Sequence, residues 1–295
     1  MSEQRSYLDQ LKDSYAHTGS LVCMGLDPIV EFLPVQSDSV RADLNTFYRT
    51  IFKEMNLLGV YPGAFKPNIG YYSALDRPLE EDFTGSLALA DLLEMLQNFF
   101  PGIPVIMDSK RGDIARSSQN YAVEAFDSWN ADAITVSPYM GTDSVSPFMV
   151  AEKGIYVLNR TSNPGGKDLQ NLQVDGEDLY LKVADVIIEW SRQHAGVGAV
   201  VGATSPAELE AVAKRYADSG AQIPLLIPGV GSQGGSASEV VSRLKSSGYD
   251  LALARINSSS GITHPWKGNP IPEDWEDVVV GNLRTLNEEI EKALV

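Results

Sequence analysis

Short apolar runs alternate along the chain with longer segments in which apolar residues recur at helical spacing. Eight such runs are bounded by polar, glycine- or proline-containing turns, and helical segments lie between them. The runs expected to form strands are 21–26, 63–69, 104–108, 133–137, 154–158, 198–202, 223–227 and 250–254. The expected helices are 7–17, 38–58, 82–99, 117–129, 141–150, 176–194, one that begins at Ser205 and Pro206, 235–246 and 273–294.

This alternation predicts the fold class. Strands that alternate with helices are usually parallel and joined by right-handed crossovers, and eight such units close a (β/α)₈ barrel. An open, doubly wound sheet is the alternative, but no Gly-x-Gly-x-x-Gly follows the first strand. No linker or low-complexity run divides the chain. We therefore expect an α/β protein, a single-domain TIM barrel over residues 1–295 with an N-terminal and a C-terminal helix.

Four charged residues cluster where the third strand ends. The segment Val-Ile-Met-Asp-Ser-Lys-Arg-Gly-Asp-Ile at 105–114 passes from a strand into a turn, and Ser117 and Ser118 can begin the next helix. Because side chains alternate along a strand, Asp108 and Lys110 should point to the same side. A solvated turn with a surface ion pair is the simpler interpretation, and Arg-Gly-Asp also matches a cell-adhesion tripeptide. A carboxylate beside an ammonium at a strand end is better suited to an active site.

Polar residues also follow other strands, at the end of the barrel where active sites lie. Asp27 ends the first strand and Lys66 ends the second, a glycine-rich loop at 228–235 follows the seventh, and 257–261 follows the eighth. Backbone amides of such a loop can approach a phosphate, which often binds after the last two strands. Alternating carboxylates and ammoniums can keep a lysine charged, and they suit proton delivery to a carbanion.

The composition argues against several classes of protein. With 39 acidic and 23 basic residues the formal net charge is −16, which disfavours binding to nucleic acid or to anionic membranes. Only one cysteine is present, and the three histidines form no HExxH pair. The first residues lack the apolar segment of a signal peptide, and no run is long enough to span a membrane. A cytoplasmic protein without a metal site is expected.

Several segments, in order, resemble one enzyme family. The segment Asp-Ser-Lys-Arg-Gly-Asp-Ile at 108–114 resembles the signature of the orotidine 5′-phosphate decarboxylases, in their longer bacterial-type branch. Other segments also resemble this family, in the expected order. They are Gly-Leu-Asp-Pro at 25–28, Phe-Lys-Pro-Asn at 65–68, Ser-Pro-Tyr-Met-Gly at 137–141, Arg-Thr-Ser-Asn-Pro at 160–164, Val-Gly-Ala-Thr at 201–204 and the loop around Gln233. The resemblance implies a cofactor-free barrel, active as a homodimer, that converts orotidine 5′-monophosphate to uridine 5′-monophosphate in pyrimidine synthesis.

The resemblance also implies catalytic roles. Lys110 would protonate C6 of the pyrimidine as carbon dioxide leaves, and Asp108 would face the substrate carboxylate. Lys66 and Asp113 would complete a Lys-Asp-Lys-Asp array, with Asp113 supplied by the partner subunit, so that the dimer shares its active sites.

Further residues would bind the nucleotide. Asp27 would hold a ribose hydroxyl, Ser117 would contact the ribose across the dimer interface, and Ser162 would form a hydrogen bond with the pyrimidine. The residues implied around the phosphate are Gln233, Gly234, Gly235, Ser259 and Ser260.

One position departs from the family pattern. After the eighth strand the family usually has Ser-Arg-x-Ile, whose arginine binds the phosphate, whereas this chain has Ser-Ser-Gly-Ile at 259–262. Ser260 therefore stands where the arginine is expected. Amides and hydroxyls hold the phosphate instead, or Arg255 or Lys267 reaches it, or the protein is impaired.

Two other functions stay open from the sequence. A related sugar-phosphate decarboxylase or aldolase-like enzyme would generally use magnesium, but no glutamate occurs from residue 101 to 122. A non-catalytic barrel that binds a nucleotide is the alternative from another class of protein. The serine at position 260 favours it, whereas the intact lysine and aspartate pattern favours an enzyme.

Overall fold

The structure is a computed structural model, and it describes residues 5–231 and 234–295. The strands of its main sheet are β1 Val22–Gly25, β2 Ala64–Lys66, β3 Ile106–Arg111, β4 Ala133–Val136, β5 Gly154–Arg160, β8 Val197–Val201, β9 Leu225–Pro228 and β10 Ala254–Ser258. The helices are α1 Tyr7–Thr18, α2 Val40–Leu58, α3 Ile69–Ser73, α4 Thr84–Phe99, α5 Ala115–Val123, α6 Thr142–Val145, α7 Leu179–Gln193, α8 Pro206–Asp218, α9 Ala237–Ser246, α10 Ser260–Thr263 and α11 Trp275–Leu294.

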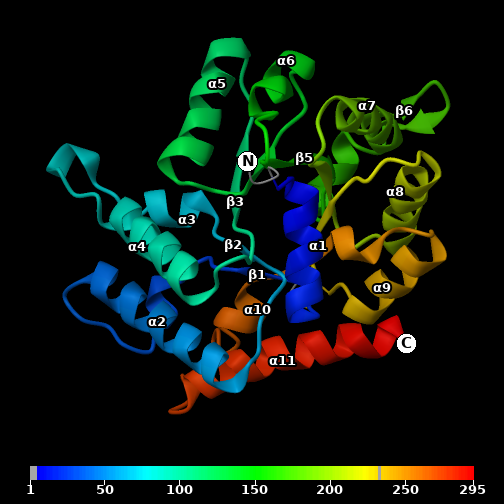
Figure 1. The fold of residues 1–295 in the computed structure, drawn as a ribbon. Coiled ribbons are helices and arrows are strands. Elements are labelled where there is room, and N and C mark those ends of the chain that lie inside the picture. The colour runs from blue at the N-terminus through cyan, green and yellow to red at the C-terminus, as the bar shows by residue number, and fades with distance from the viewer. Residues whose placement is uncertain (1–4, 232–233) are drawn as a thin grey trace.

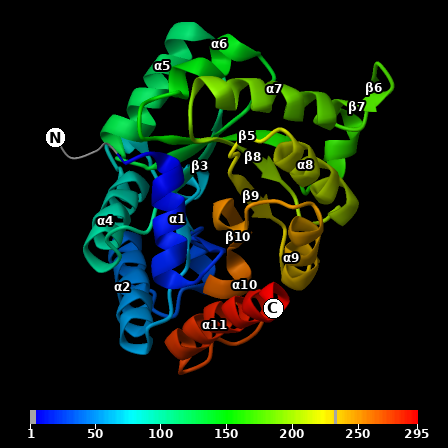
Figure 2. The same cartoon turned by 45° about the vertical axis from the view of Figure 1, so that its right-hand side comes forward.

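The eight strands form a barrel. Their order is β2-β1-β10-β9-β8-β5-β4-β3, and every ladder in this sheet is parallel. Single parallel bridges, from Phe65 to Val105 and from Asn68 to Asp108, connect β2 to β3 and bring the two ends of the sheet together. Helices surround the strands (Figure 1, Figure 2). The predicted TIM barrel is confirmed.

The helices form because their ends are capped and one face of each is apolar. In α2, the Ser39 side chain accepts a hydrogen bond from the Ala42 amide, and the helix ends at Gly59 with a φ of 63°. Its buried residues include Leu44, Phe47, Tyr48, Ile51, Phe52 and Met55, which recur at helical spacing. The strands are buried on both faces, as expected for parallel strands covered by helices.

Helix α1 covers the amino ends of the strands (Figure 1). The Tyr7 hydroxyl donates to the Tyr156 hydroxyl over 3.0 Å, and the Ser14 hydroxyl donates to the Gly63 carbonyl over 2.8 Å. The Tyr7 ring lies against Gly154, where an added Cβ would come within 2.3 Å of it. Because α1 closes this end of the barrel, the opposite, carboxyl end is left for a site.

The eighth strand begins later than the sequence predicts. The expected strand at 250–254 is wrong, because a 3₁₀ turn at Leu251–Leu253 precedes β10 and the Asp250 carboxylate caps it by accepting from the Ala252 amide. The charged Arg255 falls inside β10 and is fully buried. Its guanidinium donates to the carbonyls of Leu11, Gly63, Ala252 and Ala254, which join α1 to the start of the barrel.

Replacing Arg255 by methionine should destabilise the fold. Loss of the guanidinium removes four hydrogen bonds, three of them buried, and buried groups left unpaired cost about 1–3 kcal/mol each. Because the Leu11 and Gly63 carbonyls keep other partners, we expect the free energy of unfolding to fall by about 3 kcal/mol in denaturant titrations. Arg243→Met is the control, since its surface pairs with Glu210 and Glu239 contribute about 1 kcal/mol or less. Equal losses in both variants would contradict this role.

Other boundaries also differ from the expectation. The helix expected at 117–129 begins at Ala115 without a serine cap and ends in a π-helical turn, Glu124–Ser128. The helix expected at 141–150 is only α6 followed by a 3₁₀ turn. A short hairpin of β6 Gln173–Val174 and β7 Glu177–Asp178, which the sequence did not predict, precedes α7. Within the described residues, no helix is both long and apolar enough to cross a membrane.

Candidate active site

Three of the charged residues predicted for catalysis meet at the carboxyl ends of β2 and β3. The Asp108 carboxylate accepts from Lys66 Nζ over 2.8 Å and from Lys110 Nζ over 2.6 Å. Asp108 is 7 % exposed and Lys66 is 4 % exposed, whereas half of the Lys110 side chain is exposed. The buried pair therefore fixes the position of the carboxylate, and Lys110 remains accessible from the mouth of the barrel.

The backbone of β3 places Lys110 by an irregularity rather than by simple strand alternation. The register with β4 shifts between Met107 and Arg111, and Lys110 has a φ of 48°, in the left-handed region. Thr135 of β4 stabilises this bend, because its hydroxyl oxygen accepts from the amides of Ser109 and Lys110. The same hydroxyl donates to the Asp108 carboxylate over 2.8 Å.

The charges in this cluster favour the ionised forms of both buried partners. Burial alone would raise the pKa of Asp108, but the ammoniums of Lys66 and Lys110 outweigh it and hold this pKa well below the ordinary value. Burial would lower the pKa of Lys66, but the carboxylates of Asp27 and Asp108 raise it above the ordinary value. The site therefore favours an ionised Asp108 carboxylate beside the Lys66 ammonium.

A small cavity lies at the same end of the barrel, beside the loops that follow β1, β9 and β10. It has a volume of about 190 Å³, and the described residues that line it include Asp27, Gly229, Ser259, Ser260 and Lys267. The Asp27 carboxylate accepts from the Asn68 amide over 3.1 Å. Strand β1 ends in a glycine here because a Cβ on Gly25 would lie 1.9 Å from the Ser259 hydroxyl oxygen.

A second cavity, of about 550 Å³, lies beside the loops that follow β5 and β8. Ser162, Lys167 and Thr204 are among the residues that line it. The Thr204 hydroxyl donates to the Ser162 carbonyl over 3.0 Å, so that the two loops are joined. Ser162 is therefore at the same end of the barrel as Asp108, but it lines a different cavity from Asp27.

Comparison with known proteins identifies the family. The chain matches the model of the Orotidine 5′-phosphate decarboxylase / HUMPS family over residues 21–263. The chain belongs to this family. An orotidine 5′-phosphate decarboxylase from Bordetella avium is 39 % identical over 289 residues, which cover 97 % of this chain and 98 % of the relative. One from Cupriavidus metallidurans is 38 % identical over 283 residues, which cover 96 % and 98 %.

A solved structure of the family agrees. The structure of Leishmania donovani OMP decarboxylase superposes with a TM-score of 0.73 at 32 % identity, covering 98 % of each chain. The recognition from the sequence is thereby confirmed.

Two residues that the family resemblance assigns to the shared site make local contacts on the segment after β3. The Asp113 carboxylate accepts from the following amide, of Ile114, over 2.7 Å. The Ser117 amide donates to the Ile114 carbonyl over 3.0 Å. The described hydrogen bonds and salt bridges do not join Asp113 to Lys66, Asp108 or Lys110.

The glycine-rich loop after β9 is partly described. Gln233 lies outside the described residues, so its predicted contact with the phosphate stays a prediction. The amides of Gly231, Gly234 and Gly235 donate to carbonyls within the loop. In this conformation these three amides are not turned toward a ligand, and the predicted phosphate roles of Gly234 and Gly235 stay predictions.

The structure separates the two cations considered for the place of the missing arginine. Arg255 is fully buried and bonded to carbonyls at the amino end of the barrel, so the suggestion that it reaches a phosphate at the opposite end is wrong. Lys267 is exposed and lines the 190 Å³ cavity together with Ser260.

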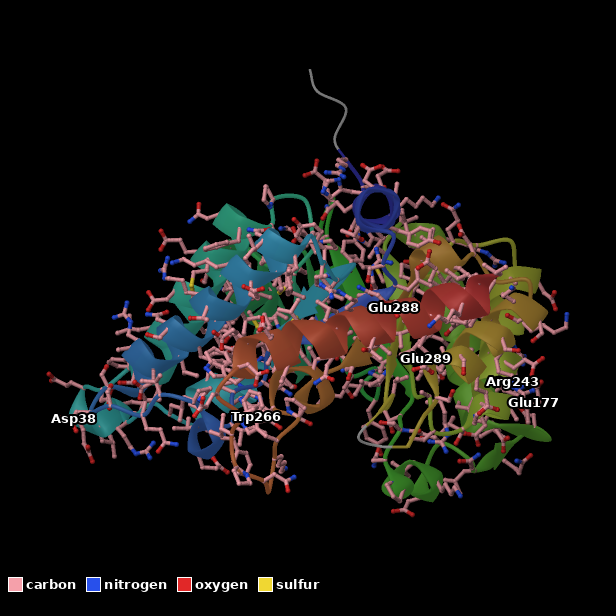
Figure 3. The ribbon with its side chains drawn as sticks, turned by 90° about the horizontal axis from the view of Figure 1, so that it is seen from below. Asp38, Glu177, Arg243, Trp266, Glu288 and Glu289 are labelled. Atoms are coloured by element: carbon pink, nitrogen blue, oxygen red, sulfur yellow. The ribbon has the colours of Figure 1, made fainter. Side chains whose placement is uncertain are left out.

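An aromatic cluster holds the segment that carries Lys267. The Trp266 ring lies near those of His264 and Trp275, and Phe47 stacks on Trp275. Figure 3 labels Trp266 on the segment between α10 and α11. Its indole Nε1 donates to the Phe32 carbonyl over 3.0 Å. The backbone before Lys267 is therefore well supported.

His264 in this cluster should make stability depend on pH. Burial, with a smaller effect of the Lys267 charge, lowers the pKa of His264 from 6.5 to about 4. Between these values the unfolded chain binds a proton that the folded chain does not, so stability is lost as the pH falls. Relative to His264→Gln, the wild-type free energy of unfolding should drop by about 1.4 kcal/mol per pH unit over this window. The free energies of unfolding come from urea titrations of both proteins at pH 7, 6 and 5. The same dependence on pH in the wild type and in His264→Gln would refute the prediction.

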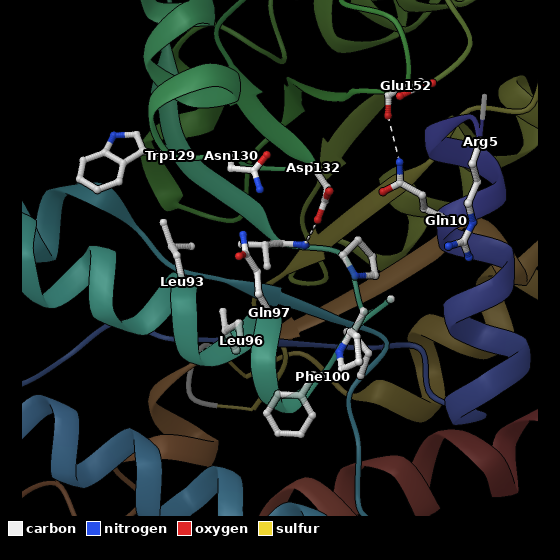
Figure 4. Close-up of a pocket in the computed structure, with 15 residues that line it drawn as sticks. Arg5, Gln10, Leu93, Leu96, Gln97, Phe100, Trp129, Asn130, Asp132 and Glu152 are labelled. Atoms are coloured by element: carbon white, nitrogen blue, oxygen red, sulfur yellow. Dashed lines mark hydrogen bonds between the residues drawn. The ribbon is translucent and has the colours of Figure 1, made fainter. Parts of the chain in front are cut away.

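Another cavity lies at the amino ends of β3, β4 and β5, away from the predicted site (Figure 4). It has a volume of about 450 Å³ and is lined by α4 residues and by Arg5, Gln10 and Asp132. The Asp132 carboxylate accepts from the Val105 amide over 2.8 Å, and burial raises its pKa. None of the residues predicted for the site lines this cavity, and the contacts of Asp132 serve the start of β3.

Sequence reasoning missed Thr135, which touches Asp108 and both amides of the bend. The available signal was a hydroxyl residue in the otherwise apolar strand Ala-Ile-Thr-Val, where Thr135 is 1 % exposed. Across residues 5–231 and 234–295, no three His, Cys, Asp or Glu side chains gather in a way that could hold a metal ion.

Proposed function

We propose that this protein is a carboxy-lyase that converts orotidine 5′-monophosphate to uridine 5′-monophosphate and carbon dioxide in pyrimidine biosynthesis. The observation that carries the proposal is the Asp108 carboxylate held between Lys66 and Lys110, at 2.8 and 2.6 Å. The relatives that match nearly the whole chain at 38–39 % identity bear the name orotidine 5′-phosphate decarboxylase, which favours this activity over that of a sugar-phosphate enzyme.

The chemistry requires a carbanion to be formed and protonated. The bond from C6 to the carboxylate breaks, its electron pair stays on C6, and carbon dioxide leaves as a neutral molecule. Lys110 then gives its proton to C6, and no cofactor is needed. Asp108, kept ionised by two lysines, would repel the substrate carboxylate and favour its loss. Lys66 holds Asp108 in place.

The nucleotide would lie across the carboxyl ends of the strands. Asp27 would hold a ribose hydroxyl, and Ser162 would form a hydrogen bond with the pyrimidine. Ser259, Ser260 and the loop with Gln233, Gly234 and Gly235 would surround the phosphate. This arrangement is supported by the cavities in which Asp27, Ser162, Ser259 and Ser260 lie and by the tendency of barrels to bind phosphate after their last two strands.

A homodimer would complete the site. Asp113 and Ser117 would reach the active site of the partner subunit, in keeping with the lack of a described hydrogen bond or salt bridge between Asp113 and the Asp108 cluster. Large apolar side chains are exposed on the segments that follow β3 and β4, as expected of a surface that a second copy covers. They are Ile114 at 57 %, Val123 at 43 %, Tyr139 at 85 % and Met140 at 50 %. We place the protein in the cytoplasm, without membrane or nucleic-acid partners, in keeping with its charge of −16.

A spectrophotometric assay tests the activity. The absorbance of the orotate ring should disappear when enzyme is added to orotidine 5′-monophosphate, at the same rate with and without a chelator. A flat trace at high enzyme concentration, with binding of uridine 5′-monophosphate retained, would instead support the nucleotide-binding barrel that Ser260 suggests. Loss of activity on chelation would point to the metal-dependent sugar-phosphate enzymes.

A further inference from the structure

We propose that Lys267 is the side chain that neutralises the nucleotide phosphate in this protein, in place of the arginine that Ser260 replaces. This proposal rests on the proposed function, because it assumes a substrate with a phosphate monoester. Such a dianion enters a protein with a net charge of −16, and a serine hydroxyl offers only a neutral donor where a guanidinium would give charge-assisted bonds. A cation from elsewhere in the chain would supply the missing positive charge.

The position of Lys267 fits this task. It lines the same cavity as Asp27, Ser259 and Ser260, and among the described lining residues it is the one cationic side chain. The cavity lies at the loops after β9 and β10, the seventh and eighth strands of the barrel, where barrels commonly bind phosphate. The salt bridges between described residues do not involve Lys267, so its charge is available to a ligand.

The segment that carries Lys267 is held in place before any ligand binds. Its amide donates to the His264 carbonyl over 3.2 Å, and the preceding Trp266 is 4 % exposed and bonded to the Phe32 carbonyl. On this segment, only the lysine side chain then has to be ordered when the phosphate binds. Because the backbone that carries Lys267 is already fixed, less conformational entropy is lost on binding, so that more of the ionic attraction appears as affinity.

The other candidates on this end of the barrel are less suitable. The amides of Gly231, Gly234 and Gly235 already donate to loop carbonyls. Arg160 lines the 550 Å³ cavity, but its guanidinium lies 2.7 Å from the Glu208 carboxylate and the residue is 3 % exposed. Lys167 is exposed in that same cavity, beside Ser162 rather than Asp27, and is the rival that the experiment has to separate.

Binding of uridine 5′-monophosphate and of uridine, measured by calorimetry, tests the role of Lys267. Lys267→Met should weaken binding of the nucleotide by about ten- to a hundredfold, because charge-assisted bonds to a phosphate are worth that much. Binding of uridine, which lacks the phosphate, should not change. Lys53→Met, at an exposed position of α2, controls for the loss of one positive charge, and Lys167→Met tests the rival. Both should leave nucleotide binding near the wild-type value.

A double-mutant cycle gives an independent measurement. If Lys267 occupies the role of the missing arginine, Ser260→Arg should raise kcat/KM for orotidine 5′-monophosphate only modestly in the wild type. In the Lys267→Met background the same change should restore most of the loss, about tenfold or more. Equal gains in both backgrounds would show that the introduced arginine and Lys267 act independently, which contradicts the proposed role of Lys267.

The outcomes separate this proposal from the proposed function. Unchanged nucleotide binding in Lys267→Met, or a larger loss in Lys167→Met, would overturn the role of Lys267 while leaving the decarboxylase intact. A similar loss of uridine binding would also overturn it, because the effect would not depend on the phosphate. Failure of the wild type both to bind the nucleotide and to decarboxylate its substrate would refute the proposed function itself.

Discussion

Replacing Lys110 by alanine should abolish turnover of orotidine 5′-monophosphate while leaving a folded protein that still binds the product. Removing a general acid costs about a hundred- to ten-thousandfold, and we expect the upper part of this range because Lys110 is the exposed ammonium beside Asp108. Rates from the spectrophotometric assay, at saturating substrate, give kcat directly.

Structural damage from this change should be small. Asp108 keeps its contacts with Lys66 and Thr135, and alanine experiences the same φ of 48° that lysine does. Circular dichroism and calorimetry with uridine 5′-monophosphate should therefore give nearly wild-type results. Lys53→Ala is the control for a lysine lost elsewhere. Turnover above a tenth of the wild-type value in Lys110→Ala would show that another group donates the proton.

The barrel could be predicted because its signals are local. Each apolar run and each amphipathic helix is visible within a short window, and the number of units then determines the closed form. Arg255 shows where this fails. A charged residue marks a strand end in any local pattern, but two of the carbonyls that bind Arg255 come from Leu11 in α1 and Gly63 just before β2. A contact between residues so far apart in the chain leaves no periodic signal.

The candidate site was predictable in its residues but less so in its geometry. Asp108 and Lys110 were expected to share one face of a regular strand, and the structure brings them together through a bend in β3. That bend depends on the Thr135 hydroxyl in the neighbouring strand, which no pattern within 105–114 reveals. The proposed phosphate end was less predictable, since the sequence left Arg255 and Lys267 as alternatives and only the structure shows that Lys267 lines the cavity.

Mixing two inactive variants should restore activity if Asp113 acts across the dimer. Lys110→Ala and Asp113→Ala would each lack one group in every site of their own homodimer. In a mixed dimer, one site takes Lys110 from one chain and Asp113 from the other and is intact. Random exchange of subunits makes about half the dimers mixed, so about a quarter of all sites should work. The assay is the decarboxylation rate after exchange, followed with two affinity tags.

A control mixture of two other variants tests whether the recovery depends on Asp113. Lys110 Nζ lies 2.6 Å from the Asp108 carboxylate of the same chain. Mixing Lys110→Ala with Asp108→Ala therefore leaves every site of the mixed dimer without one of the two groups. That mixture should remain inactive under the same exchange conditions. The exposed Ile114, next to Asp113 in the sequence, and the exposed Tyr139, in the loop after β4, would provide apolar surface on which the two copies meet. If verified exchange restores no activity to the Asp113→Ala mixture, Asp113 serves its own subunit and the site is not shared.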